Sequence, residues 1–285
     1  MSTSRVLLLG AIAGLTIFVG LPVGRATSMR SGLRAFLNAA AIGILVFLLY
    51  DVLSHGIEPV NNALTQAHAG HGSWWRFAGL AALFAACLAV GALVLVYYDR
   101  WALGRSKRRE SARPFGPGAA AVQELAPAGR THLTPPQRLA FCIALGIGLH
   151  NFAEGLAIGQ SAAKGELRLA LLLIVGFGLH NATEGFGIVA PLAADAERPS
   201  WRFLFTLGLI GGGPTFFGTA VGQVFVNDAV FLAFLALAAG SILYVIVQLL
   251  HVASKLGHKE LLMWGLLAGL LAGFATDLVL TAAGA

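Results

Sequence analysis

Long apolar runs separated by short polar segments dominate the chain. A helix needs about 20 residues to cross the hydrocarbon core of a bilayer, and each run is close to that length or longer. The runs cover residues 6–24, 35–55, 77–98, 139–162, 169–193, 203–226, 229–250 and 261–282. Because they use most of the chain, the pattern predicts an all-α integral membrane protein with eight transmembrane helices in a single domain, residues 1–285.

The composition excludes other broad classes. Of the 285 residues, 57% are apolar and 11% are charged, and the mean hydropathy is +0.78. A soluble domain carries roughly 25% charged residues, so the composition argues against a soluble enzyme and excludes a disordered chain. The two cysteines lie in apolar runs and give no disulfide framework.

The basic residues predict an orientation. An even number of spans places both termini on one side. If that side is outside, all of the 19 Lys and Arg residues fall on the inner side except Arg5, Arg76, Lys164 and Arg168. The positive-inside rule therefore favours an N-out, C-out protein of the plasma (inner) membrane, with residues 99–137 as a cytoplasmic linker between the third and fourth helices. Such a basic excess marks loops of a protein whose partner is the lipid bilayer, not a nucleic acid.

Two central runs contain nearly the same motif. Residues 146–159 read GIGLHNFAEGLAIG, and residues 176–189 read GFGLHNATEGFGIV. The two segments align at a spacing of 30 residues. The polar residues they share are His150, Asn151 and Glu154 in the first and His180, Asn181 and Glu184 in the second.

The spacing within each motif has a chemical consequence. Residues i and i+4 share one face of a helix, so each His projects together with the following Glu. An ionised side chain near the bilayer centre costs about 3 kcal/mol or more, so these groups must face one another, water or an ion. Imidazole, carboxylate and amide oxygen together suit Zn, Fe or Mn, and the absence of thiolate argues against Cu(I). The plainer alternative is a pair of interhelical hydrogen bonds.

The two motif helices are expected to be close neighbours. The connection 163–168 is short, which makes them antiparallel. Glycines on both helices would allow their backbones to approach. These glycines are Gly148, Gly155 and Gly159 on the first helix and Gly178, Gly185 and Gly187 on the second.

Further polar residues are candidates for an entry and an exit path. Asp51, His55 and Glu58 follow i, i+4, i+7 spacing at the outer end of the second run and could guide a cation inward. At the inner end of the seventh run, Gln248 and His251 could line an exit. For both sets the alternative is an interfacial helix end.

Three other features have weaker functional interpretations. His68 and His71 lie in a predicted outer loop, 59–76, where they could capture metal. Asp277 is interpreted as interfacial. The Gly211–Pro214 segment is expected to break or bend the sixth run, which would free backbone carbonyls.

With its paired HNxxEG motifs, the chain resembles the ZIP (Zrt/Irt-like) family of divalent metal transporters. The resemblance implies eight helices in a 3+2+3 arrangement with inverted repeats, both termini outside, and a long loop between helices three and four. It implies a principal metal site of His150, Glu154, His180 and Glu184, with Asn151 and Asn181 in an adjoining second site. Many members carry a Glu-Pro in helix six that bridges two metals. Gly213 and Pro214 stand there in this chain, which favours a single metal.

The expected function is therefore transport of a divalent transition-metal cation into the cytoplasm by alternating access. Zn is the first candidate, and Fe, Mn and Cd are alternatives. The metal is the substrate, and neither an organic cofactor nor an enzymatic activity is expected. A membrane metalloenzyme of the di-iron type and a non-transporting metal sensor are the competing classes, and a homodimer is compatible with the sequence.

Overall fold

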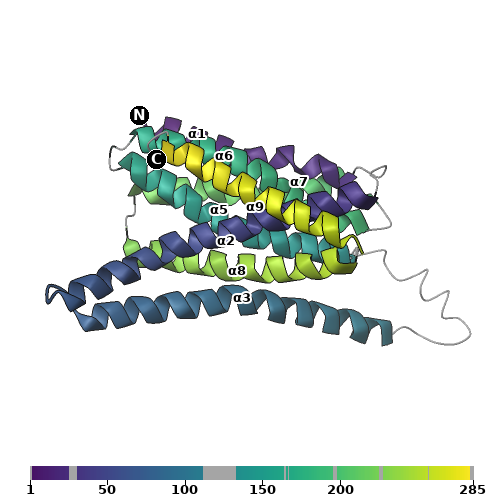
Figure 1. Cartoon of the computed structure of the whole chain (residues 1–285), viewed down its shortest axis with the longest axis horizontal. Helices are drawn as coiled ribbons and strands as arrows, with labels where there is room; N and C mark the ends of the chain where they lie inside the picture. Colours follow the sequence, from purple (N-terminus) through teal and green to yellow (C-terminus); the bar gives the residue numbers. More distant parts are fainter. Residues whose placement is uncertain are drawn as a thin grey trace, which may run out of the picture.

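In the computed structural model, long helices follow one another along the chain (Figure 1). The structure describes residues 2–25, 31–111, 133–163, 165, 167–194, 198–224, 227–255 and 257–282. The helices are α1 (Thr3–Leu15), α2 (Ser31–His68), α3 (Trp74–Ser111), α5 (Pro135–Ala163), α6 (Leu167–Val189), α7 (Trp201–Val224), α8 (Asp228–Lys255) and α9 (Lys259–Ala282). Short 3₁₀ segments extend two of them: η1 (Thr16–Val19) and η2 (Leu21–Arg25) follow α1, and η3 (Ala190–Ala194) follows α6.

The predicted membrane spans are helices. Within the described residues, seven helical segments are long enough and apolar enough to cross a membrane. They match seven of the predicted runs, and α6 with its 23 residues lies where the run 169–193 was predicted. The protein is thus an all-α membrane protein. The helix α1 begins and α9 ends at the same end of the bundle, as an even number of crossings requires (Figure 1).

The predicted outer loop 59–76 is wrong over most of its length, because α2 continues through Pro59 to His68. Beyond the apolar run, Gly56, Val60, Ala63 and Ala67 are buried and repeat at the spacing of a helix face. The sequence analysis overlooked this stripe, since polar residues surround it. The turn that joins α2 to α3 is consequently short, and Gly70 adopts a φ of 76° in it.

The helix α3 also exceeds its predicted run, since it extends to Ser111. Residues 99–111 therefore belong to a helix and not to the predicted linker. The segment WALGRSKRRES is rich in good helix formers and contains no proline, which accounts for the extension. Of the predicted linker 99–137, residues 112–132 lie outside the described part, and α5 begins at Pro135.

The glycines of the two motifs contact different helices from those predicted. A Cβ at Gly155 of α5 would collide with the carbonyl oxygen of Thr215 in α7, and one at Gly185 of α6 would collide with the carbonyl oxygen of Ile17 in η1. The expectation that these glycines bring α5 and α6 together is therefore wrong. They instead allow α5 to pack closely on α7, and α6 on the first span. Small residues allow close packing against any neighbouring helix of complementary shape, so they do not specify which helix that is.

The contact of Gly155 with Thr215 and the contact of Gly185 with Ile17 are equivalent in the two halves of the chain. Gly155 and Gly185 are 30 residues apart, and their partners Thr215 and Ile17 are 198 apart. The outer helix pairs repeat a contact in the same manner. Gly91 of α3 lies against the carbonyl of Leu237 in α8, and Gly269 of α9 lies against the carbonyl of Ala40 in α2. The first three and the last three helices thus use corresponding positions for packing.

Candidate metal centre

The polar residues of both motifs lie in the middle of the helix bundle. His150, Asn151 and Glu154 of α5 and Asn181 and Glu184 of α6 are all buried, with at most 5% of their surface exposed. The backbone of His180 belongs to α6, but its side chain lies outside the described residues. The burial expected of the described motif residues is confirmed.

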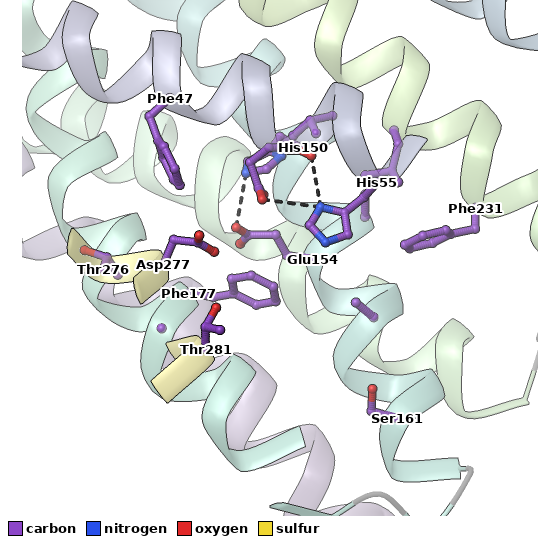
Figure 2. Close-up of a pocket in the computed structure, with 16 residues that line it drawn as sticks. Phe47, His55, His150, Glu154, Ser161, Phe177, Phe231, Thr276, Asp277 and Thr281 are labelled. Atoms are coloured by element: carbon purple, nitrogen blue, oxygen red, sulfur yellow. Dashed lines mark hydrogen bonds and ion pairs between the residues drawn. The ribbon is translucent and has the colours of Figure 1, made fainter. Parts of the chain in front are cut away.

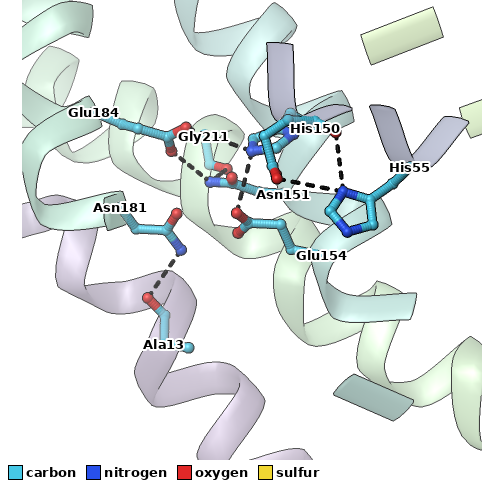
Figure 3. A network of polar contacts seen from close by, with 9 residues as sticks. Ala13, His55, His150, Asn151, Glu154, Asn181, Glu184 and Gly211 are labelled. Atoms are coloured by element: carbon cyan, nitrogen blue, oxygen red, sulfur yellow. Dashed lines mark hydrogen bonds and ion pairs between the residues drawn. The ribbon is translucent and has the colours of Figure 1, made fainter. Parts of the chain in front are cut away.

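Three ionisable side chains from two helices converge here. The Nε2 atom of His150 lies 3.1 Å from Oε1 of Glu154 on the same helix, which confirms the predicted i, i+4 contact. The same Nε2 atom lies 4.0 Å from Oε1 of Glu184 on α6. Figure 3 shows the two carboxylates approaching the imidazole from different sides. One imidazole and two carboxylates therefore share one buried position.

The two asparagines donate hydrogen bonds at this level of the bundle. Nδ2 of Asn151 donates to Oε2 of Glu184 at 3.1 Å and to the carbonyl of Gly211 in α7 at 3.0 Å. Nδ2 of Asn181 donates to the carbonyl of Ala13 in α1 at 3.1 Å (Figure 3). The side-chain oxygens of both asparagines are buried and accept no hydrogen bond from the described residues.

A cavity of about 370 Å³ leads away from His150 and Glu154 (Figure 2). It follows α5 from His150 to Ser161, a distance of about 16 Å at the rise of an α-helix. Its polar lining consists of Asp51, His55, His150, Glu154, Ser161, Thr276, Asp277 and Thr281. The remaining lining is mostly apolar and includes Phe47, Phe177 and Phe231.

The predicted entry residues divide into two groups. Asp51 and His55 line the cavity, and Nδ1 of His55 lies 3.3 Å from Oδ1 of Asp51. Glu58 is exposed and is not part of the lining.

Asp277 is a site residue that the sequence analysis missed. It lines the cavity beside Thr276, a place that its interpretation as an interfacial residue did not include. The packing of α9 on α2 brings it there, with the rings of Phe47 and Phe274 5.0 Å apart. A signal was available, because Asp277 is the only charged residue in the run 261–282. An isolated charge in a membrane span is by default a functional candidate.

The other predicted residues lie away from the cavity. Leu235 of α8 lines it, and Gln248 lies about 20 Å further along the same helix. Gln248 is half-buried and His251 is exposed. His68 and His71 are exposed at the turn between α2 and α3. The structure therefore does not bring the predicted exit residues or the turn histidines to the buried site.

The segment around Pro214 does not break the helix, because α7 is continuous from Trp201 to Val224. A break there is therefore wrong, and a bend of the continuous helix stays a prediction. The backbone still contributes a polar atom to the site through the carbonyl of Gly211, the acceptor of Asn151.

Among the side chains that the structure describes, no group of three or more His, Cys, Asp and Glu is arranged to hold a metal ion. Of the four predicted principal ligands, the structure describes the side chains of His150, Glu154 and Glu184. The side chain of His180 lies outside the described residues. No protein-family model matches the chain, and no curated protein is significantly similar to it in sequence.

Proposed function

We propose that the protein transports a divalent transition-metal cation across the membrane through the site formed by His150, Glu154 and Glu184, with His180 as a further ligand. The observation that carries the proposal is the convergence of one imidazole and two carboxylates from two helices in an apolar membrane core. The donor set suits Zn, Fe or Mn and offers no thiolate. Zn is the first candidate, and Fe, Mn and Cd are the alternatives.

The energetics of burial support a cation as the partner of this site. Two carboxylates at the bilayer centre cost about 3 kcal/mol or more each when ionised. The imidazole of His150, which lies between them, can balance one negative charge at most. A divalent cation would balance both, and its ligands must be deprotonated to bind it, so binding at Glu154 or Glu184 would release protons.

The cavity supports a path to one side of the membrane. It is lined by the second half of α5, the N-terminal part of α8 and the C-terminal part of α9, so it faces the end of the bundle where α9 ends. The positive-inside rule assigns that end to the outside. The carboxylates of Asp51 and Asp277 would attract a cation from there toward Glu154.

On the other side of the site the core is closed. Ile143 and Ile147 of α5 and Ile188 of α6 are fully buried in the main apolar cluster. A cation bound at the site therefore needs a rearrangement of the helices to leave in that direction. An alternating-access cycle, in which the cavity closes on one side and opens on the other, meets that requirement.

The packing pattern supports a ZIP-like 3+2+3 bundle with inverted repeats. The contact of Gly155 with Thr215 recurs as that of Gly185 with Ile17, with the partners 198 residues apart. Inverted repeats place a substrate site at the interface of the two halves near the bilayer midplane, where the two motifs lie. A single bound metal fits best, because Gly213 stands in α7 where a bridging glutamate would be needed for two.

The test is uptake of Zn, Fe, Mn and Cd into proteoliposomes. We expect Zn uptake by the wild type and uptake near background for His180→Ala and Glu184→Gln. Glu58→Gln is the matched control, because this exposed carboxylate does not line the cavity. Redox turnover without metal flux would favour a metalloenzyme, and metal binding without flux would favour a sensor. Equal uptake by the wild type and both site variants would refute the site.

A further inference from the structure

The first span and α7 each depart from regular α-helical hydrogen bonding at corresponding positions, and we refer to these two places as irregular turns. The α-helical geometry of α1 ends at Leu15 and changes to 3₁₀ geometry at Thr16. Pro214 interrupts the hydrogen bonding of α7 because it has no backbone N–H. The two positions are 198 residues apart, as are Ile17 and Thr215, the partners of the motif glycines.

Each irregular turn is held by an asparagine of the neighbouring motif helix. Asn181 donates to the carbonyl of Ala13, three residues before Thr16. Asn151 donates to the carbonyl of Gly211, three residues before Pro214. The two accepting carbonyls are again 198 residues apart, and both asparagines have no exposed surface. The same polar contact therefore occurs twice, once in each half of the bundle.

We propose that Asn151 and Asn181 are positioning residues that fasten the irregular turns of α7 and α1 to the motif helices. Asn151 has a second task, because its other amide N–H holds Oε2 of Glu184. The orientation of the Glu184 carboxylate thereby depends on the position of α7. The coupling of Glu184 to the position of α7 matters for metal transport, and this part rests on the proposed function. The fastening itself is a property of the protein without metal.

The chemistry of the amide supports this role. An amide nitrogen has two N–H donors and no lone pair for a metal. Nδ2 of Asn151 uses both donors, on Glu184 and on Gly211. The carbonyl of Ala13 also accepts a hydrogen bond from Oγ1 of Thr16 at 2.7 Å, so the Asn181 amide is the link between this carbonyl and α6 and not its sole donor. Loss of such an interhelical hydrogen bond should loosen the turn that it holds. An aspartate at either position keeps the side-chain oxygens and removes the donor.

The test is hydrogen–deuterium exchange on the metal-free full-length protein in nanodiscs. We expect Asn181→Asp to speed exchange about tenfold or more in residues 10–19 and to leave residues 208–218 unchanged. We expect Asn151→Asp to do the reverse, so each variant is the control for the other. If the aspartate variants do not fold, Asn181→Ser and Asn151→Ser shorten the side chain below the reach of the carbonyl and serve the same comparison.

Unchanged exchange in both segments, or equal changes in both segments for either variant, would overturn the proposal. Transport gives a second readout. Asn181→Asp should lower the maximal rate about tenfold while KM for Zn changes less than about twofold, because Asn181 donates to α1 and not to Glu184. A large change in KM with an unchanged maximal rate would instead assign Asn181 to the metal itself. If the wild type transports no metal, the proposed function fails, and the exchange data still decide whether the asparagines fasten the turns.

Discussion

The helices α2 and α8 hold corresponding positions but carry different chemistry beside the buried site. Gly43 of α2 and Gly240 of α8 make equivalent close contacts, with α9 and α3 respectively. The positions of these glycines differ by 197 residues, and the same shift relates Asp51 to Gln248. Asp51 and Asp277 line the cavity, whereas Gln248 does not. Two similarly packed helices thus carry a carboxylate on one side of the buried site and a neutral amide on the other.

This difference gives the proposed transport a direction. Carboxylates at the mouth of a low-dielectric cavity raise the local concentration of cations. A neutral amide on the far side attracts a cation less and would hold it less strongly on release.

Loss of either buried carboxylate should have the largest effect. We expect Glu154→Gln and Glu184→Gln to lower the affinity for Zn by about 100-fold or more, because each removes a negative charge and a ligand oxygen from the site. Equilibrium binding to the purified protein measures this directly. An affinity within about threefold of the wild type in both variants would remove the basis of the site.

The sequence predicted this pair of carboxylates because two motifs with i, i+4 spacing define which residues share a helix face. It also predicted the helical spans, since apolar runs of sufficient length have few alternatives in a membrane. A helix face does not specify the partner helix, however. The glycines at 155 and 185 therefore contact α7 and η1 instead of each other's helix, and the place of Asp277 beside α2 emerges only from the packing of α9.

A methyl group at Gly155 should be the next most damaging change. We expect Gly155→Ala to destabilise the protein by about 1–3 kcal/mol, because the new Cβ would collide with the carbonyl of Thr215 in α7. Gly213→Ala is the matched control. Nothing lies within 4 Å of a Cβ at that position, so alanine there should be neutral or slightly stabilising. Thermal unfolding in detergent compares the two, and equal melting temperatures would contradict the packing of α5 on α7.

Neutralising the mouth of the cavity should weaken capture without destroying the site. We expect Asp51→Asn and Asp277→Asn each to raise KM for Zn uptake about threefold to tenfold at low ionic strength, with less effect at high salt. The maximal rate should change little. Glu58→Gln should leave KM unchanged because this residue lies outside the cavity. An equal effect of all three substitutions would mean that general surface charge, and not the cavity, attracts the ion.

The smallest effect is expected from adding a charge on the opposite side. Gln248→Glu places a carboxylate at the position of α8 that corresponds to Asp51 of α2. We expect the maximal uptake rate to fall about twofold to threefold, because the cation is held longer during release, while KM stays the same. Uptake at varied Zn concentration separates these parameters. A faster maximal rate would show that a neutral far side is not what favours release.

X-ray absorption spectroscopy of the Zn-loaded protein identifies the atoms that bind the metal. We expect Zn bound only by nitrogen and oxygen ligands, with an imidazole contribution that decreases in His150→Ala. Carboxylate ligation should be disturbed in Glu184→Gln. A bound Zn with sulfur ligands, or with an unchanged spectrum in both variants, would contradict the assignment of the metal to this buried site.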